Sequence, residues 1–213
     1  MEILLVRHGE PVTMVSEDGP VDPHLTERGH WQAEQLGEWL AHEPIDHVVA
    51  SNKQRAIQTA VPTANRLGLE PEIVADLAEL DRNSRIYGSP AVLAERFPDY
   101  FDAMRNGDFE RIGWDSYEVF QERVLGAWND LVAQPRGERV LVACHGGTIG
   151  VILSHVIGAS SHGVFDSTPY ASVSRIAVVG KDARVRTLHE MAHFDGIRDA
   201  THGVEGPAGL AGA

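Results

Sequence analysis

Two segments of the chain share a pattern in which a run of apolar residues ends in His-Gly. The first reads Leu-Leu-Val-Arg-His-Gly and ends at Gly9, and the second reads Val-Ala-Cys-His-Gly and ends at Gly146. Glycine lets the backbone turn sharply and approach a ligand, and histidine supplies a nucleophile, a base or a donor near neutral pH. One histidine at the end of a strand is usually only a polar cap. Two in the same context, the first directly after Arg7, indicate a site built around His8 and His145.

Both apolar runs are continuous rather than alternating, which is typical of strands that are buried on both faces of a sheet. The pattern predicts strands over 3–6, 47–50, 72–75, 140–144, 172–179 and 185–188, and helices over 25–40, 53–67, 116–133 and 147–157. Strands that alternate with helices indicate a mostly parallel sheet with helices on both faces, a three-layer α/β/α architecture. Ligands of such sheets bind beyond the carboxyl ends of the strands, where both His-Gly pairs fall.

Between Asp81 and Trp114 the pattern loosens, with glycine and proline separating short helical pieces such as 91–97. That composition indicates a small helical cap, inserted over about 82–115 into a single domain that we expect to span residues 1–203. Residues 204–213 are rich in glycine and alanine, and we expect them to form a disordered tail.

Charge and cysteine content narrow the classes of function. The chain has 213 residues, with 31 Asp and Glu against 18 Lys and Arg, and a formal net charge of −13. An acidic chain has little net cation for a phosphate backbone or an anionic bilayer, which disfavours nucleic acid and membrane as partners. With Cys144 alone no intrachain disulfide can form, and the opening apolar run is too short for a secretory leader, so we expect a cytoplasmic protein.

Together with three further segments, the two His-Gly segments resemble the motifs of the histidine phosphatase superfamily, which is also called phosphoglycerate mutase-like. The resemblance covers most of residues 1–194. Its five blocks stand in the family's order: Arg-His-Gly-Glu at 7–10, Leu-Thr-Glu-Arg-Gly at 25–29, Ser51 with Arg-Ala-Ile-Gln-Thr-Ala at 55–60, Leu-Ala-Glu-Leu-Asp at 77–81, and Cys-His-Gly-Gly at 144–147. Any one block is weak evidence, whereas five in order are specific.

The resemblance implies a metal-independent phosphomonoesterase of the histidine acid phosphatase type, without a cofactor. His8 would attack phosphorus in line and become phosphohistidine, which splits one displacement into two easier ones. Glu79 would protonate the leaving oxygen and then deprotonate the attacking water. Fixed donors must meet the charge on the phosphate oxygens, and the implied donors are Arg7, Arg55, His145 and Gly146.

The resemblance leaves two questions open. Asp81 lies two residues after Glu79, on the same side if the segment is extended, so either carboxylate could be the acid. The mutases of the superfamily carry Ser, Trp and Asn shortly after the opening motif, whereas residues 11–14 read Pro-Val-Thr-Met here. That difference favours water as the phosphate acceptor. A phosphoglycerate mutase-type isomerase is the alternative, and a non-hydrolytic binding protein is disfavoured because it needs no nucleophile.

We expect a small phosphorylated metabolite as the substrate, no nucleic acid and no membrane as partners, and a homodimer as one candidate assembly. The cap sets which phosphoester is bound. Its candidates for recognising a second anionic group are Arg82, Arg85, Arg96, Arg105 and Arg111.

A competing motif lies at 189–199, where the sequence reads His-Glu-Met-Ala-His-Phe-Asp-Gly-Ile-Arg-Asp. On a helix, His189 and His193 would bind zinc with Glu190 as the base, as in a zinc metalloprotease. The metzincin class also needs a downstream turn that contains methionine, and no methionine follows Met191. A predicted strand also ends directly before the motif, and we therefore keep the protease as a remote alternative.

Overall fold

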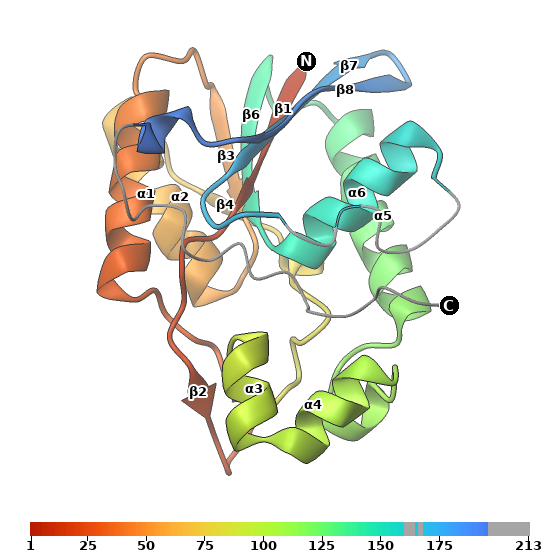
Figure 1. The fold of residues 1–213 in the computed structure, drawn as a ribbon. Coiled ribbons are helices and arrows are strands. Elements are labelled where there is room, and N and C mark those ends of the chain that lie inside the picture. The colour runs from red at the N-terminus through yellow and green to blue at the C-terminus, as the bar shows by residue number, and fades with distance from the viewer. Residues whose placement is uncertain (160–164, 166–167, 196–213) are drawn as a thin grey trace.

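The computed structural model describes residues 1–159, 165 and 168–195, which form a six-stranded sheet covered by helices (Figure 1). The strand order is β4-β3-β6-β1-β7-β8. The first four strands in that order are parallel, and β7 and β8 are antiparallel to their neighbours. The strands are β1 (Glu2–Arg7), β3 (His47–Ala50), β4 (Glu72–Ile73), β6 (Arg139–Cys144), β7 (Val173–Val179) and β8 (Asp182–Glu190). The expected α/β class with a mostly parallel central sheet is confirmed.

Two helices cover each face of the sheet: α1 (Glu27–Leu40) and α2 (Gln54–Leu67) on one, α5 (Tyr117–Ala133) and α6 (Gly146–Ile157) on the other (Figure 1). Side chains of β1 alternate between the two faces. Ile3 and Leu5 pack with α5 and α6, while Leu4 and Val6 pack with α1 and α2. Burial on both faces explains why the sequence of β1 is continuously apolar. Among the described helices, none combines the length and the apolar composition that a membrane span requires.

The ends of the first two helices follow from local residue chemistry. The Thr26 side chain accepts a hydrogen bond from the Gly29 amide at 2.9 Å and so caps the N-terminus of α1. Helix α2 ends at Gly68, whose φ of 68° lies in the left-handed region that favours glycine at this position.

Several short elements lie beyond the carboxyl ends of the parallel strands (Figure 1). They are β2 (Met14–Val15), its antiparallel partner β5 (Ile86–Tyr87), α3 (Pro90–Arg96), α4 (Pro98–Arg105) and the 3-10 turn η2 (Glu110–Ile112). Proline begins both helices because the first helical residue needs no amide donor. The short helices match the sequence expectation, the β2–β5 ribbon was not expected, and the domain boundaries stay predictions.

Other segments differ from the sequence expectations in length. Strand β4 stops at Ile73, and the 3-10 turn η1 (Ala75–Leu77) follows, whereas the last strand is longer than expected because it pairs with β7 along most of its length. Residues 204–213 lie outside the described residues, so the expected disorder of that tail stays a prediction.

The helix required by the zinc protease reading does not form. His189 and Glu190 belong to β8, where Glu190 pairs with Val173 of β7, and His189 has a φ of 50°. His193 lies in the separate 3-10 turn η3 (Ala192–Phe194), and its ring stacks on Trp39 of α1 with centroids 5.1 Å apart. Sheet pairing therefore overrides the local helical spacing, and the protease alternative is wrong. No group of three or more metal-ligating side chains occurs in the described part of the chain.

Candidate active site

Parallel pairing of β1 with β6 brings the two His-Gly segments together. Arg7 pairs with Cys144 at the last position of the ladder, and the His8 amide donates to the Cys144 carbonyl at 3.0 Å. His8 and His145 are the next residues after this pair, and the centroids of their rings lie 5.2 Å apart. Both residues are no more than 2% exposed. The two histidines therefore share one buried site.

The His8 ring is held in one protonation state. Its Nδ1 lies 2.7 Å from the Gly9 carbonyl oxygen, which can only accept, so Nδ1 carries the proton and Nε2 keeps a free lone pair. Burial, followed by the positive charges of Arg55 and Arg7, lowers the pKa of His8 well below its usual value. A neutral imidazole with a free Nε2 can act as a nucleophile.

Close backbone contacts fix the loop after His8. The Gly9 amide donates to the Thr59 hydroxyl of α2 at 2.9 Å. A side chain at Gly29 would overlap the carbonyl oxygen of Glu10, so the first turn of α1 packs directly on this loop. Glycine is required there by space.

Arg7 lies beside the start of α6. One of its terminal nitrogens donates to the Thr168 carbonyl, and its guanidinium carbon lies 4.1 Å from the centroid of the Tyr170 ring. A side chain at Gly146 would come within 3.4 Å of Arg7 Nε, so the guanidinium lies close against the helix N-terminus. The amides at this end of a helix favour negative charge.

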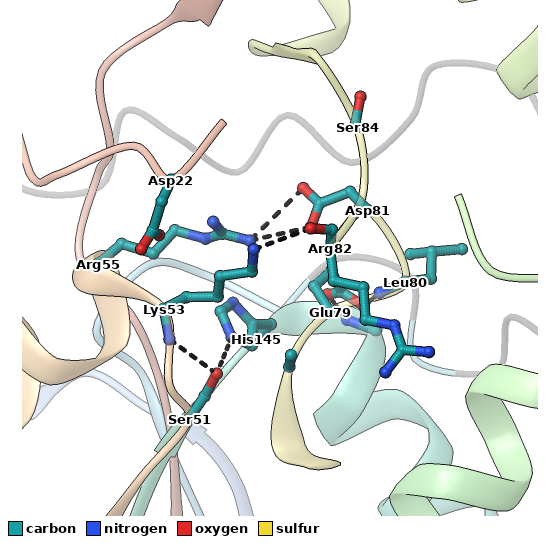
Figure 2. A network of polar contacts seen from close by, with 12 residues as sticks. Asp22, Ser51, Lys53, Arg55, Glu79, Leu80, Asp81, Arg82, Ser84 and His145 are labelled. Atoms are coloured by element: carbon teal, nitrogen blue, oxygen red, sulfur yellow. Dashed lines mark hydrogen bonds and ion pairs between the residues drawn. The ribbon is translucent and has the colours of Figure 1, made fainter. Parts of the chain in front are cut away.

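Arg55 is 1% exposed in the first turn of α2, which excludes a solvated helix position. Its Nη2 lies 3.1 Å from Asp81 Oδ1, an ion pair that is drawn in Figure 2. Its guanidinium carbon lies 4.7 Å from the centroid of the Tyr87 ring. The carboxylate and the ring orient the guanidinium, because an arginine side chain alone has several rotatable bonds.

His145 precedes the first residue of α6, and its Nε2 lies 2.8 Å from the Ser51 hydroxyl (Figure 2). Burial, followed by Arg55 and then His8, lowers the pKa of His145 well below its usual value. The second histidine is therefore neutral near pH 7.

Three buried nitrogens of this site have no hydrogen-bond partner among the described residues: Arg7 Nε, Arg55 Nε and His145 Nδ1. Most buried polar groups in proteins are paired. Several unpaired nitrogens around one buried histidine fit a ligand with acceptor oxygens, which is the chemistry of a phosphate group.

The two candidate acids contact different partners. Glu79 Oε2 accepts from the Gly147 amide in the first turn of α6 at 2.7 Å, and Oε1 accepts from the Leu80 amide at 3.0 Å. Burial, followed by the charge of Asp81, raises the pKa of Glu79. Asp81 is paired with Arg55 instead.

Arg123 of α5, which no sequence motif indicated, contacts the segment before Glu79. Its side chain is 8% exposed, donates to the carbonyls of Asp76 at 2.8 Å and Ala78 at 2.7 Å, and pairs with Asp115 at 2.9 Å. The sequence offered one signal for this residue, a cation placed three residues after Phe120, beside the apolar face of the predicted helix. Its partners lie far away in sequence and could not be read from that spacing.

Residues 3–190 match the family model described as histidine phosphatase superfamily (branch 1). The chain belongs to the histidine phosphatase superfamily. The resemblance drawn from the five sequence blocks is thereby confirmed.

Two curated relatives carry different names, one a probable mutase and the other a probable phosphatase. The chain is 29% identical, over 162 residues, to a probable phosphoglycerate mutase of Salmonella paratyphi A, which covers 74% of this chain and 75% of the relative. It is 26% identical, over 223 residues, to a probable phosphatase of Schizosaccharomyces pombe, which covers 95% of each.

Solved structures of the superfamily share the fold. A putative alpha-ribazole-5'-P phosphatase from Escherichia coli has a TM-score of 0.72 at 23% identity, with 89% of this chain and 96% of that chain covered. A phosphoglycerate mutase from Bacillus anthracis has a TM-score of 0.66 at 20% identity, with 91% and 94% covered. At these identities the likeness concerns the fold alone.

Proposed function

We propose that this histidine phosphatase superfamily member hydrolyses a small phosphomonoester through a phosphohistidine at His8, without a metal ion. The observation that carries the proposal is the neutral His8 with a free Nε2, beside unpaired buried nitrogens of Arg7, Arg55 and His145. The proposed partner is a small phosphorylated substrate. A cytoplasmic location and a homodimer stay predictions of the sequence.

The reaction has two steps. In the first, His8 Nε2 attacks phosphorus, the bond from phosphorus to the alcohol oxygen breaks, and Glu79 gives that oxygen its proton. In the second, Glu79 takes a proton from water, the water oxygen attacks phosphorus, and the nitrogen–phosphorus bond breaks. The products are the alcohol and inorganic phosphate.

Charge in the transition state spreads over the non-reacting phosphate oxygens. Planar guanidinium groups at Arg7 and Arg55 match those oxygens, and both are oriented by aromatic rings before substrate arrives. Because these groups supply the charge that a metal ion supplies in other phosphatases, the proposed mechanism does not use one.

Phosphoglycerate mutase activity is the second candidate, favoured by the name of the Salmonella relative. A mutase returns the phosphoryl group to an alcohol, whereas a phosphatase gives it to water. Phosphorus NMR of the products separates the two, because only the phosphatase releases inorganic phosphate. Net transfer between hydroxyls without release would overturn the proposal.

Rapid-quench experiments with a labelled phosphoester test the intermediate. We expect an acid-labile, base-stable phosphoenzyme that His8→Ala abolishes and that the exposed His30→Ala control retains. Turnover should also persist in chelator. Turnover that survives His8→Ala, or that a chelator destroys, would contradict the mechanism.

A further inference from the structure

Ser51 lies at the carboxyl end of β3 and is fully buried. Its Oγ is 2.8 Å from His145 Nε2 and accepts from the Lys53 amide at 3.3 Å (Figure 2). The family blocks place this serine near the site but give it no task in the reaction described above.

The direction of the bond from Ser51 to His145 follows from counting protons. A hydroxyl has one proton to donate, and the Lys53 amide already donates to its oxygen. If Nε2 of His145 also donated, the hydroxyl proton would have no acceptor among the described residues. The lone pair on Nδ1 would then be unpaired as well, whereas a hydroxyl that donates to Nε2 leaves only the Nδ1 proton without a partner, so the hydroxyl donates to Nε2.

A neutral imidazole that accepts at Nε2 carries its proton on Nδ1. In His145 that second nitrogen is buried and has no partner among the described residues, and the ring lies beside His8. With the opposite tautomer, Nδ1 would present a lone pair, which repels a phosphate oxygen.

We propose that Ser51 is a positioning residue that holds His145 in the Nδ1–H tautomer, so that this proton is donated to a phosphate oxygen. The identity of the ligand rests on the proposed function, whereas the tautomer does not. The Gly9 carbonyl oxygen fixes the proton of His8 on Nδ1 and frees Nε2 for attack. The Ser51 hydroxyl donates to Nε2 of His145 and leaves Nδ1–H available as a donor. The His8 ring therefore presents a lone pair to the phosphate group, and the His145 ring presents a proton.

Nitrogen NMR of the full chain with labelled histidine reads the tautomer directly, with the His145 signals assigned by their loss in His145→Gln. Near neutral pH we expect Nδ1 to be protonated and Nε2 to be unprotonated. In Ser51→Ala we expect the other tautomer to gain population and orthophosphate binding to weaken about tenfold. We also expect kcat/KM to fall about 10- to 100-fold, because the loss of one donor to a transition-state oxygen has an effect of about 100-fold or more. Ser51→Thr keeps the hydroxyl and restores both readouts.

Ser174→Ala in β7 is the matched control, because it removes another buried serine hydroxyl, which accepts from the His189 amide. It should leave the His145 signals and phosphate binding unchanged. A protonated Nε2 in the wild-type chain overturns the inference, even if Ser51→Ala fails to fold. So does a Ser51→Ala variant with an unchanged tautomer and unchanged phosphate affinity. If the tautomer is as expected but no phosphoenzyme forms, the proposed function fails and the inference about the tautomer stands.

Discussion

Glu79 and Asp81 are two residues apart in sequence, yet their carboxylates belong to different parts of the site. Asp81 balances the buried charge of Arg55, and Glu79 accepts from amides that include the first turn of α6. A carboxyl group that is buried and lies near another negative charge holds its proton more tightly. These contacts support Glu79 as the proposed acid and Asp81 as a group that positions Arg55.

Substitution of each carboxyl group separates these roles. Glu79→Gln should slow hydrolysis of alkyl phosphates by about 10²- to 10⁴-fold, because alkoxide leaving groups need a proton. It should affect a nitrophenyl phosphate little. Asp81→Asn should act mainly on phosphate affinity, by releasing Arg55. Steady-state kinetics on both substrate types check this, and the reverse pattern would reassign the acid to Asp81.

The pH profile gives a second test of Glu79. The acid must be protonated in the first step, so kcat/KM should fall as pH rises through its raised pKa. Asp81→Asn removes one cause of that raised pKa and should move this alkaline limb to lower pH, while Glu79→Gln should abolish it. Because the pKa of His8 is lowered, the nucleophile stays neutral well below the pH at which histidine usually charges. An alkaline limb that is unchanged in Glu79→Gln would contradict the assignment.

At the scale of elements, the first turn of α6 follows the sheet strand β6 and contacts both Glu79 and Arg7. A side chain at Gly147 would overlap Glu79 Oε1. Gly147→Ala should therefore displace the carboxylate and slow alkyl phosphate hydrolysis by about tenfold or more. Gly150→Ala on the same helix has its nearest neighbour at 3.6 Å and is the matched control. Equal activity of the two variants would show that Glu79 does not depend on this contact.

Helix α5 contributes through Arg123. Arg123→Leu leaves the carbonyls of Asp76 and Ala78 without their donor and Asp115 with one cation fewer. We expect a loss of about 2 kcal/mol in the free energy of unfolding and a fall in kcat larger than the change in KM. Denaturant unfolding and kinetics measure both. The exposed Arg186→Leu on β8 serves as control, and a stable Arg123→Leu variant with normal kcat would refute the role.

The sequence predicted the strands and helices best where the decisive pattern is local. Continuous apolar runs predict β1 and β6, and the helices predicted over 25–40 and 53–67 coincide closely with α1 and α2. The bond between Ser51 and His145 and the contacts of Arg123 join segments that are far apart in the chain, so no spacing reveals them. Local spacing misled at 189–193, because pairing with β7 decides the backbone conformation there.

At the scale of the whole molecule, the net charge of −13 contrasts with a site that holds Arg7 and Arg55. Two cap arginines proposed for a second anion are engaged: Arg82 pairs with Asp115, and Arg85 donates to the Glu17 carbonyl. An additional negative group on the alcohol would meet the field of a chain with net charge −13, and this repulsion weakens with salt.

Glycerol 3-phosphate and 3-phosphoglycerate form a matched pair, since they differ by a hydroxymethyl group against a carboxylate. We expect kcat/KM at low salt to be about tenfold higher for glycerol 3-phosphate, and the ratio to shrink as salt screens the repulsion. A preference for 3-phosphoglycerate would favour the mutase alternative.

The pairing of β1 with β6 also affects when the active site forms during synthesis and folding. His8 lies near the start of the chain and His145 far along it, and only this pairing places them side by side. Contacts between distant segments form late in folding, because closing a long loop costs entropy before the contact can compensate. A ribosome-bound chain that ends before β6 thus holds the proposed nucleophile but lacks the strand that completes the site. Catalytic activity during synthesis or refolding therefore reports that the centre of the sheet has closed.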